Sequence, residues 1–147
     1  MASHLTEYRI LYRDTDSMGV LYYGRYLELF ELGRTEWLRD AGLRYRDMEQ
    51  NEGRMLPVTQ AECRYLAPIR FDVLAQIHTA VHGWTSSTLS FSHEIYDSES
   101  GVLCATGGVE LGCVGMEDWK PTRLPEVYRQ LMARLVPERR HLRLRLR

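Results

Sequence analysis

The sequence predicts an α+β fold: a five-stranded antiparallel sheet wrapped around one long helix, with a short helix near the C-terminus. Residues 24–41 repeat apolar side chains at helical spacing, whereas five other stretches alternate apolar and polar residues as strands do. Four of these stretches follow the helix in succession and are joined by short turns. Because runs of consecutive strands favour antiparallel pairing with helices on one face, a sheet curled around the long helix is the simplest packing.

The long helix is expected to be amphipathic and four to five turns long. Its predicted buried face consists of Tyr26, Leu27, Phe30, Gly33, Trp37, Leu38 and Ala41. Gly42 follows as a stop signal. Gly33 costs up to ~1 kcal/mol relative to alanine inside a helix. A close approach of the helix to the surrounding sheet would justify that cost.

The five expected strands span residues 8–13, 59–65, 72–82, 88–96 and about 102–114. Residues 43–54 are polar and read as irregular, and residues 83–86 and 97–101 read as the turns before and after the fourth strand. Within the last strand, Gly107 and Gly108 indicate a bend or bulge.

The C-terminal helix is expected after Pro121, with Pro125 at its first position and an apolar stripe of Val127, Leu131 and Leu135. Residues 139–147 form a basic tail that we expect to be flexible. No internal repeat is visible, so residues 1–138 are interpreted as one domain.

Composition places the chain among ordinary globular proteins. Of its 147 residues, 44% are hydrophobic and 27% are charged, and the net charge of −1 provides no field that would attract nucleic acid or an anionic membrane. The N-terminal residues lack the pattern of a signal peptide, and no apolar run approaches the ~20 residues that span a bilayer. Cys63, Cys104 and Cys113 are an odd number without metal-ligand spacing, which predicts free thiols and a cytoplasmic location.

The stretch with the most chemical content runs from Asp14 to Tyr26, where a strand pattern gives way to the long helix. It contains two carboxylates, at Asp14 and Asp16, just ahead of the predicted helix start. The first N–H groups of a helix lack intrahelical partners and carry partial positive charge, so they can hold an oxyanion. A carboxylate near such a point is a candidate general base or nucleophile.

The same residues carry a family resemblance. Residues 12–23, Tyr-Arg-Asp-Thr-Asp-Ser-Met-Gly-Val-Leu-Tyr-Tyr, resemble the opening of hotdog-fold acyl-CoA thioesterases of the 4-hydroxybenzoyl-CoA thioesterase type. The resemblance continues through Tyr26, Phe30, Glu31, Arg34, Thr35 and Glu36, and residues 65–72 resemble the second signature of that family. It covers residues 7–135 and implies the hotdog fold, subunits that join their sheets edge to edge as homodimers or homotetramers, and active sites at the subunit interface.

The resemblance also implies roles for individual residues. Asp16 aligns with the catalytic aspartate of the family, acting on water or attacking the thioester to give a mixed anhydride; the alternative is that Asp16 only caps a short turn. Backbone N–H groups at Tyr23 and Gly24 are expected to polarise the thioester carbonyl. Asp14 is expected to position the loop through hydrogen bonds. The substrate-binding residues are then Gly19, Val20, Tyr22, Gly24 and Arg70.

Several of these roles have alternatives. Tyr22 and Tyr23 either line the acyl or pantetheine channel or pack between subunits. Gly24 would let the substrate approach the backbone closely. Arg70 either meets a phosphate of coenzyme A or forms a surface salt bridge.

The function that follows is hydrolysis of acyl-CoA to a carboxylic acid and a free thiol, with no metal or redox cofactor. The alternatives are release of acyl groups from an acyl carrier protein and binding of acyl-CoA without cleavage. His78 and His82 would lie about 13 Å apart along a strand, too far for one metal ion. His93 is in phase with core residues of its strand and reads as a buried histidine. The sequence contains no Gly-x-Ser-x-Gly elbow and no glycine-rich phosphate loop.

Overall fold

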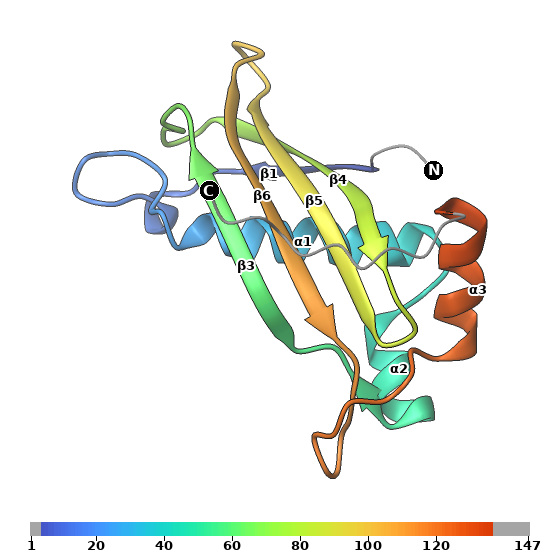
Figure 1. Ribbon diagram of the computed structural model, residues 1–147. Helices are drawn as coiled ribbons and strands as arrows, with labels where there is room; N and C mark the ends of the chain where they lie inside the picture. The colour runs from blue at the N-terminus through green and yellow to red at the C-terminus, as the bar shows by residue number, and fades with distance from the viewer. Residues whose placement is uncertain (1–3, 137–147) are drawn as a thin grey trace.

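A five-stranded antiparallel sheet and one long helix form the body of the protein, as a computed structural model shows for residues 4–136 (Figure 1). The sheet has the order β1-β4-β5-β6-β3 and consists of β1 (His4–Arg9), β3 (Val58–Tyr65), β4 (Leu74–Trp84), β5 (Thr88–Asp97) and β6 (Leu103–Gly112). The remaining elements are the 3-10 turn η1 (Tyr12–Asp14), α1 (Arg25–Asp40), α2 (Tyr45–Glu52), the small strands β2 (Arg54–Met55) and β7 (Val114–Gly115), and α3 (Glu126–Leu135). The predicted fold class is therefore confirmed.

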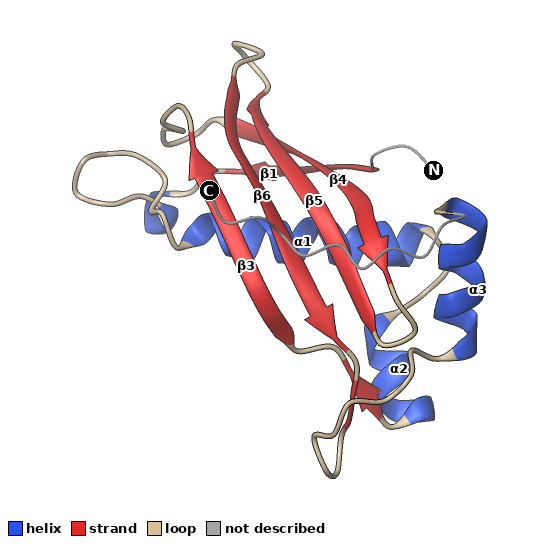
Figure 2. Cartoon of the chain, in the orientation of Figure 1, coloured by secondary structure: helices blue, strands red, loops and turns tan. Residues whose placement is uncertain are grey.

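The helices are arranged unequally around the sheet. In Figure 2, α1 lies behind the strands and crosses them, whereas α2 and α3 lie beyond one end of the sheet. None of the helices within residues 4–136 combines the length and apolar character needed to cross a membrane.

The buried face of α1 explains the glycine in its middle. This face consists of Tyr26, Leu29, Phe30, Gly33, Trp37 and Leu38. A methyl group on Gly33 would collide with the hydroxyl of Thr79 and lie 3.0 Å from a methyl group of Ile77, both on β4. The expected close approach of the helix to the sheet is thus confirmed. Leu27 was expected to be buried but is exposed, and Leu29 takes its place because it lies on the side that faces β1 and β4.

The inward side chains of the central strands are those that the alternating pattern predicts. On β5, Leu89, Phe91, His93 and Ile95 are all buried. A bend or bulge was expected at Gly107 and Gly108; the bulge is wrong, because β6 keeps its register with both neighbours through these residues. Gly107 instead makes room for α1: a methyl group there would overlap the ring of Phe30 and the carbonyl oxygen of Glu62.

Three local expectations are wrong. The first strand ends at Arg9 rather than residue 13, because the Asp14 carboxylate accepts a hydrogen bond from Leu11 N–H and turns the chain into η1. Residues 45–52 form α2 rather than an irregular segment. The turn after β4 starts later than expected, since Gly83 and Trp84 still pair with β5.

The C-terminal helix lies where expected, but its start and its buried side chains differ from the prediction. Pro125 is the N-cap residue, just before the helix, rather than its first position. Tyr128, Leu131 and Met132 are buried, while Val127 is exposed. The predicted basic tail, residues 139–147, lies outside the described residues, so its flexibility stays a prediction.

Candidate active site

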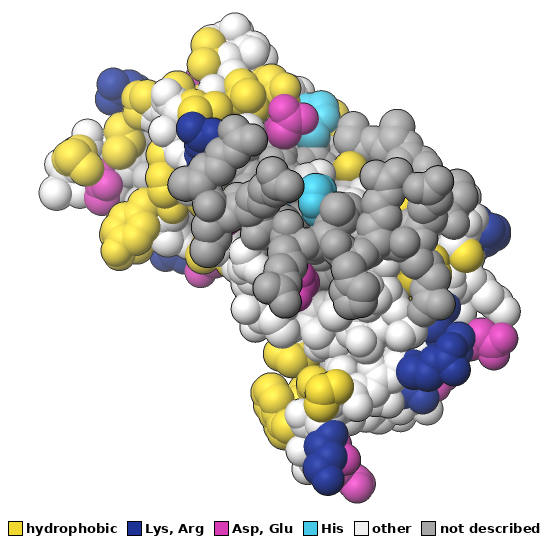
Figure 3. All heavy atoms as spheres, viewed as in Figure 1, with side chains coloured by type: hydrophobic (Ala, Val, Ile, Leu, Met, Phe, Trp, Pro, Cys, Tyr) yellow, Lys and Arg dark blue, Asp and Glu magenta, His cyan; other side chains and the backbone are white. Residues whose placement is uncertain are grey.

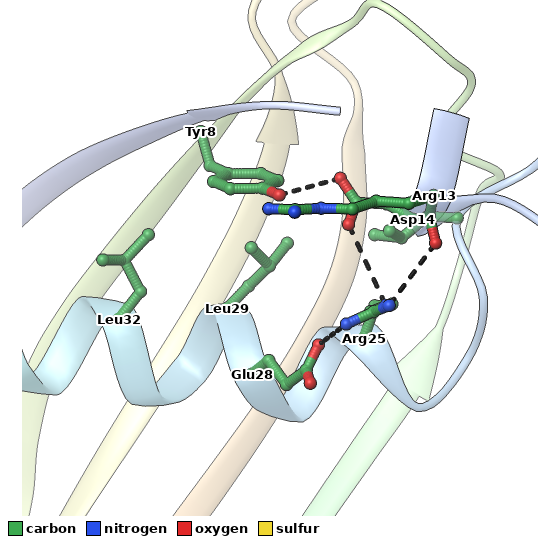
Figure 4. A pocket seen from close by; sticks show the side chains of 8 residues that line it. Tyr8, Arg13, Asp14, Arg25, Glu28, Leu29 and Leu32 are labelled. Atoms are coloured by element: carbon green, nitrogen blue, oxygen red, sulfur yellow. Dashed lines mark hydrogen bonds and ion pairs between the residues drawn. The ribbon is translucent and has the colours of Figure 1, made fainter. Parts of the chain in front are cut away.

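Asp14 anchors the loop that leads into α1. Its carboxylate is 3% exposed and accepts hydrogen bonds of 2.8 Å from Leu11 N–H and from the Tyr8 hydroxyl (Figure 4). Its other oxygen lies 3.9 Å from the guanidinium of Arg25 in the first turn of α1. Asp14 therefore ties β1, η1 and the helix start together, and the predicted positioning role is confirmed.

Asp16 lies two residues further on, in a tight turn. One carboxylate oxygen, Oδ1, accepts a 2.8 Å hydrogen bond from Met18 N–H. The turn closes through Asp16 N–H to the Val20 carbonyl at 2.9 Å and Gly19 N–H to the Asp16 carbonyl at 3.0 Å. Gly19 has a φ of 79°, which only glycine adopts without strain. The turn-capping contact expected in the alternative interpretation is thus present, but it uses one oxygen: within residues 4–136, Oδ2 has no hydrogen-bond partner.

The two sequence motifs lie side by side. Leu21 N–H donates to the Ile69 carbonyl at 2.7 Å, and Val20 forms a β-bridge with Arg70. The turn that carries Asp16 is thereby fastened to the segment that follows β3.

A shallow cleft with a volume of about 310 Å³ lies where these segments meet. It is lined by Asp16, Met18, Val20, Leu21, Tyr23, Tyr26, Tyr65, Leu66, Ala67 and Pro68. Asp16 is the only charged residue among them. Figure 3 shows apolar side chains gathered at this end of the molecule, and Met18 and Tyr23 are 75% and 64% exposed. A carboxylate within an apolar wall suits a reaction on an acyl group.

The start of α1 borders this cleft through Tyr23. Gly24 is the N-cap residue, and Arg25 N–H donates to the Tyr22 carbonyl at 2.9 Å. In the described part of the chain, the N–H groups of Tyr23 and Gly24 make no hydrogen bond. Unpaired N–H groups at a helix start are suited to an oxyanion.

Tyr65 is a site residue that the sequence reasoning did not single out. It is the last residue of β3, and its hydroxyl donates a 2.9 Å hydrogen bond to the Tyr23 carbonyl. Its ring meets Tyr26 edge to face, with centroids 4.9 Å apart. Burial raises the pKa of Tyr65 to about 12, so the hydroxyl keeps its proton. The position of Tyr65 at the head of the second motif was the available signal.

Of the predicted substrate-binding residues, Val20 lines the cleft, whereas Gly19, Tyr22, Gly24 and Arg70 do not. The Tyr22 ring is tilted against that of Tyr23, with centroids 4.6 Å apart, and it covers Gly24: one ring carbon is 3.0 Å from where a Gly24 methyl group would be. Arg70 is exposed and makes no ion pair with another described residue.

A second pocket of about 380 Å³ opens on the other side of the loop. It lies between Tyr8 of β1 and the first turns of α1, and Leu21 borders both pockets. Polar groups that line it are already paired with one another: the Asp14 carboxylate accepts a hydrogen bond from the Tyr8 hydroxyl, and Arg25 forms an ion pair with Glu28 at 2.8 Å (Figure 4). The cleft at Asp16 is therefore the better candidate site.

None of the described histidines or cysteines lines this cleft, although the Cys63 thiol interacts with the Tyr65 hydroxyl. His93 is 1% exposed, and its Nδ1 is 3.0 Å from the Thr79 hydroxyl. Burial lowers the pKa of His93 to about 3. Cys104 and Cys113 are buried and Cys63 is half-buried, all three are free, and burial raises the pKa of each thiol. Residues 4–136 contain no group of side chains arranged to hold a metal ion.

Known proteins are similar to this chain in both sequence and fold. The model of the thioesterase-like superfamily matches residues 10–134. YneP of Bacillus subtilis, which carries a provisional acyl-CoA thioesterase name, is 30% identical over 122 residues, covering 83% of this chain and 87% of YneP. The acyl-CoA thioester hydrolase YbgC of Escherichia coli O6:H1 is 30% identical over 118 residues, covering 80% and 87%.

The solved structure of a DHNA-CoA thioesterase from Staphylococcus aureus superimposes with a TM-score of 0.80 at 31% identity, covering 93% of this chain and 85% of that one. The fold is thus the hotdog fold found in thioesterases. The chain belongs to the thioesterase-like superfamily, and its class is that of the enzymes that hydrolyse thioesters.

Proposed function

We propose that this protein hydrolyses acyl-CoA thioesters, releasing a carboxylic acid and coenzyme A. The observation that supports this most is the cleft that the half-buried Asp16 and Tyr23 both line, at the helix start where the N–H groups of Tyr23 and Gly24 make no hydrogen bond with a described residue. The similarity to enzymes named for acyl-CoA substrates points to the same substrate class. A cytoplasmic location, with which the three free thiols agree, belongs to this proposal.

The N–H groups of Tyr23 and Gly24 receive the carbonyl oxygen of the thioester, which becomes an oxyanion as the carbonyl carbon is attacked. Each such donor contributes roughly 3–4 kcal/mol in comparable sites. Asp16 acts through Oδ2, because Oδ1 is held by Met18 N–H. Oδ2 either takes a proton from the attacking water or attacks the carbonyl itself; in the second case water cleaves the mixed anhydride that results. The thiolate of coenzyme A leaves in both routes, and both require the Asp16 carboxylate.

The groups around the cleft are assigned to the rest of the substrate. Gly19, Val20 and Tyr22 line the path of the pantetheine arm, and Gly24 receives the thioester against its backbone once the Tyr22 ring moves aside. Arg70 is bridged to Val20 and carries a guanidinium without a partner among the described residues, which suits a phosphate of coenzyme A.

We also propose that a second copy of the chain completes the site. β3 pairs with β6 on one side, and no described strand pairs with its other edge. Val58 and Tyr65, at the two ends of β3, are each 50% exposed. Since Tyr65 also lines the cleft, a second β3 pairing along this edge would cover the exposed apolar wall beside Asp16. Sedimentation of the purified protein as a dimer or tetramer is expected; a monomer at the concentrations used for activity would contradict this part of the proposal.

The test of the catalytic proposal measures free-thiol release from aliphatic and aromatic acyl-CoAs and from acylated acyl carrier protein. The Asp16→Asn variant is expected to lose turnover by about 10²–10⁴-fold. Asp47→Asn is the control, because Asp47 forms only an exposed ion pair with Arg44. Near-normal hydrolysis by a folded Asp16→Asn protein would remove Asp16 from the mechanism. If the unaltered protein binds acyl-CoA tightly but releases no thiol, the protein is an acyl-CoA binding protein and the proposed hydrolase function is refuted.

A further inference from the structure

The turn at the start of α1 is held by a side chain from β3, the edge strand farthest from β1 in the sheet. Tyr65, at the end of β3, reaches across to the carbonyl of Tyr23, which is 42 positions earlier in the chain. This is a side-chain hydrogen bond to a backbone group in a turn where the N–H groups of Tyr23 and Gly24 have no hydrogen-bond partner among the described residues.

The geometry of a peptide unit gives this bond its consequence. A trans peptide is planar, and its C=O and N–H point in opposite directions, so holding the oxygen fixes the direction of the hydrogen. The Tyr23 carbonyl shares its peptide unit with Gly24 N–H, and the described chain contains no cis peptide bond. Similarly, the Tyr22 carbonyl shares its unit with Tyr23 N–H, and it accepts from Arg25 N–H at 2.9 Å. Each unpaired N–H therefore belongs to a peptide whose oxygen is anchored.

We propose that Tyr65 is a positioning residue of the thioesterase reaction, whose hydroxyl fixes the peptide unit between Tyr23 and Gly24 and with it the direction of Gly24 N–H. The proposal rests on the proposed function, because it assigns a purpose to Gly24 N–H only if that group receives the thioester oxygen. The backbone of Tyr65 suits this role: it pairs with Ala105 in the sheet, and Leu66 N–H and Ala67 N–H both donate to the Cys104 carbonyl. Tyr65 is thus attached to the main sheet.

Two properties keep Tyr65 in its donor role. Its ring is held edge to face against Tyr26 in the first turn of α1, so removing the hydroxyl alone leaves the ring packing in place. Its raised pKa of about 12, caused first by burial, means that the hydroxyl stays a donor throughout the working range of a thioesterase. Phenylalanine is therefore the variant that keeps the ring and removes only the hydroxyl, with its bond to Tyr23 and its interaction with the Cys63 thiol.

The experiment compares Tyr65→Phe with Tyr96→Phe, which also loses a tyrosine hydroxyl but one whose partner is the exposed Glu94 carboxylate on β5. Tyr65→Phe is expected to lower kcat by on the order of 10-fold, because an oxyanion donor is misdirected but not removed. KM is expected to stay within a factor of two, and the melting temperature to stay well above that of the assay. Tyr96→Phe is expected to leave all three unchanged.

A second readout does not depend on activity. The Gly24 amide signal in a ¹⁵N-resolved NMR spectrum is expected to shift and broaden in Tyr65→Phe and to stay in place in Tyr96→Phe. An unchanged kcat, or an unchanged Gly24 signal, would overturn the positioning role. A raised KM with unaltered kcat would overturn it too, because that result means contact with the substrate.

Failure of this inference can be told apart from failure of the proposed function. Loss of activity in Asp16→Asn with full activity in Tyr65→Phe refutes the positioning role alone. Absence of thioester hydrolysis by the unaltered protein refutes the proposed function, and the NMR comparison then still decides whether Tyr65 restrains Gly24.

Discussion

The most direct quantitative prediction concerns His93, the buried histidine of β5. Its ring is stacked on Phe30 of α1 with centroids 4.6 Å apart, and its Nδ1 is 3.0 Å from the Thr79 hydroxyl. Its Nε2 is buried and has no partner among the described residues. A proton on this ring would place a charge inside the core, and for that reason burial lowers the pKa of His93 from 6.5 to about 3.

The sign of the pH effect follows from proton binding. Between pH 3 and 6.5 the unfolded chain protonates His93 and the folded chain does not, so acid favours unfolding across this window. In the unfolded chain the pKa of His93 is 6.5, which is 1.5 units above a solution pH of 5. This difference lowers the free energy of unfolding by about 2 kcal/mol relative to pH 7.5. For a chain of this length, such a loss lowers the melting temperature by about 4–8 °C.

The assay is urea denaturation at pH 7.5 and pH 5, at one fixed protein concentration, for the unaltered protein and for His93→Leu. His93→Leu is expected to be less stable at pH 7.5, because the Thr79 hydroxyl loses its partner. Between pH 7.5 and 5, however, its free energy of unfolding is expected to fall by about 2 kcal/mol less than that of the unaltered protein. His82→Gln, at an exposed histidine, is expected to keep the pH dependence of the unaltered protein. Parallel pH dependences for the unaltered protein and His93→Leu would refute the argument.

Two further changes test how the fold positions the site. Gly107→Ala is expected to cost about 2–3 kcal/mol in urea denaturation, since its methyl group would overlap the Phe30 ring and a backbone carbonyl that cannot move away easily. Asp14→Ala is expected to cost about 2–3 kcal/mol and to reduce acyl-CoA turnover, because Leu11 N–H and the Tyr8 hydroxyl lose their shared acceptor and the loop before α1 loses its anchor.

Each of these changes has a matched control. Gly112→Ala lies on the same strand as Gly107, but its methyl group would meet only a methyl group of Thr59 at 3.1 Å, so its cost is expected to be smaller. Asp47→Ala removes a carboxylate from an exposed pair and is expected to cost less than about 1 kcal/mol. Equal costs within either pair would show that the contacts named here do not determine the effect.

The sequence determined the elements whose pattern is enforced by burial along their whole length. Alternation identified the four inward residues of β5, because a one-residue slip would have placed all of them in solvent. The spacing of α1 identified its face, and Gly33 correctly indicated a close approach to the sheet. The motif around Asp14 and Asp16 also stood out, because residues 12–23 resemble the opening of a thioesterase family; carboxylates ahead of a helix start are by themselves common as caps.

Tertiary structure decided what no local pattern carries. α2 has a polar sequence in which Met48 is the one buried residue, so its apolar period is too weak to read. It is stabilised by contacts from elsewhere, such as the Leu56 N–H that donates to the Tyr45 hydroxyl, and Gly53 ends it at a φ of 61°. Likewise, whether Leu27 or Leu29 is buried depends on which side of α1 faces β1 and β4.

The candidate site divides in the same way. Asp16 and Tyr23 could be proposed from the chain because they lie in one continuous motif next to a helix start, and both line the same cleft. Tyr65 could not be assigned its hydrogen bond, because the partner lies 42 positions away and the two meet only when β3 is placed at the sheet edge beside the start of α1. Local chemistry can thus be read from neighbouring residues, whereas the direction of a backbone N–H depends on contacts that only the folded chain brings together.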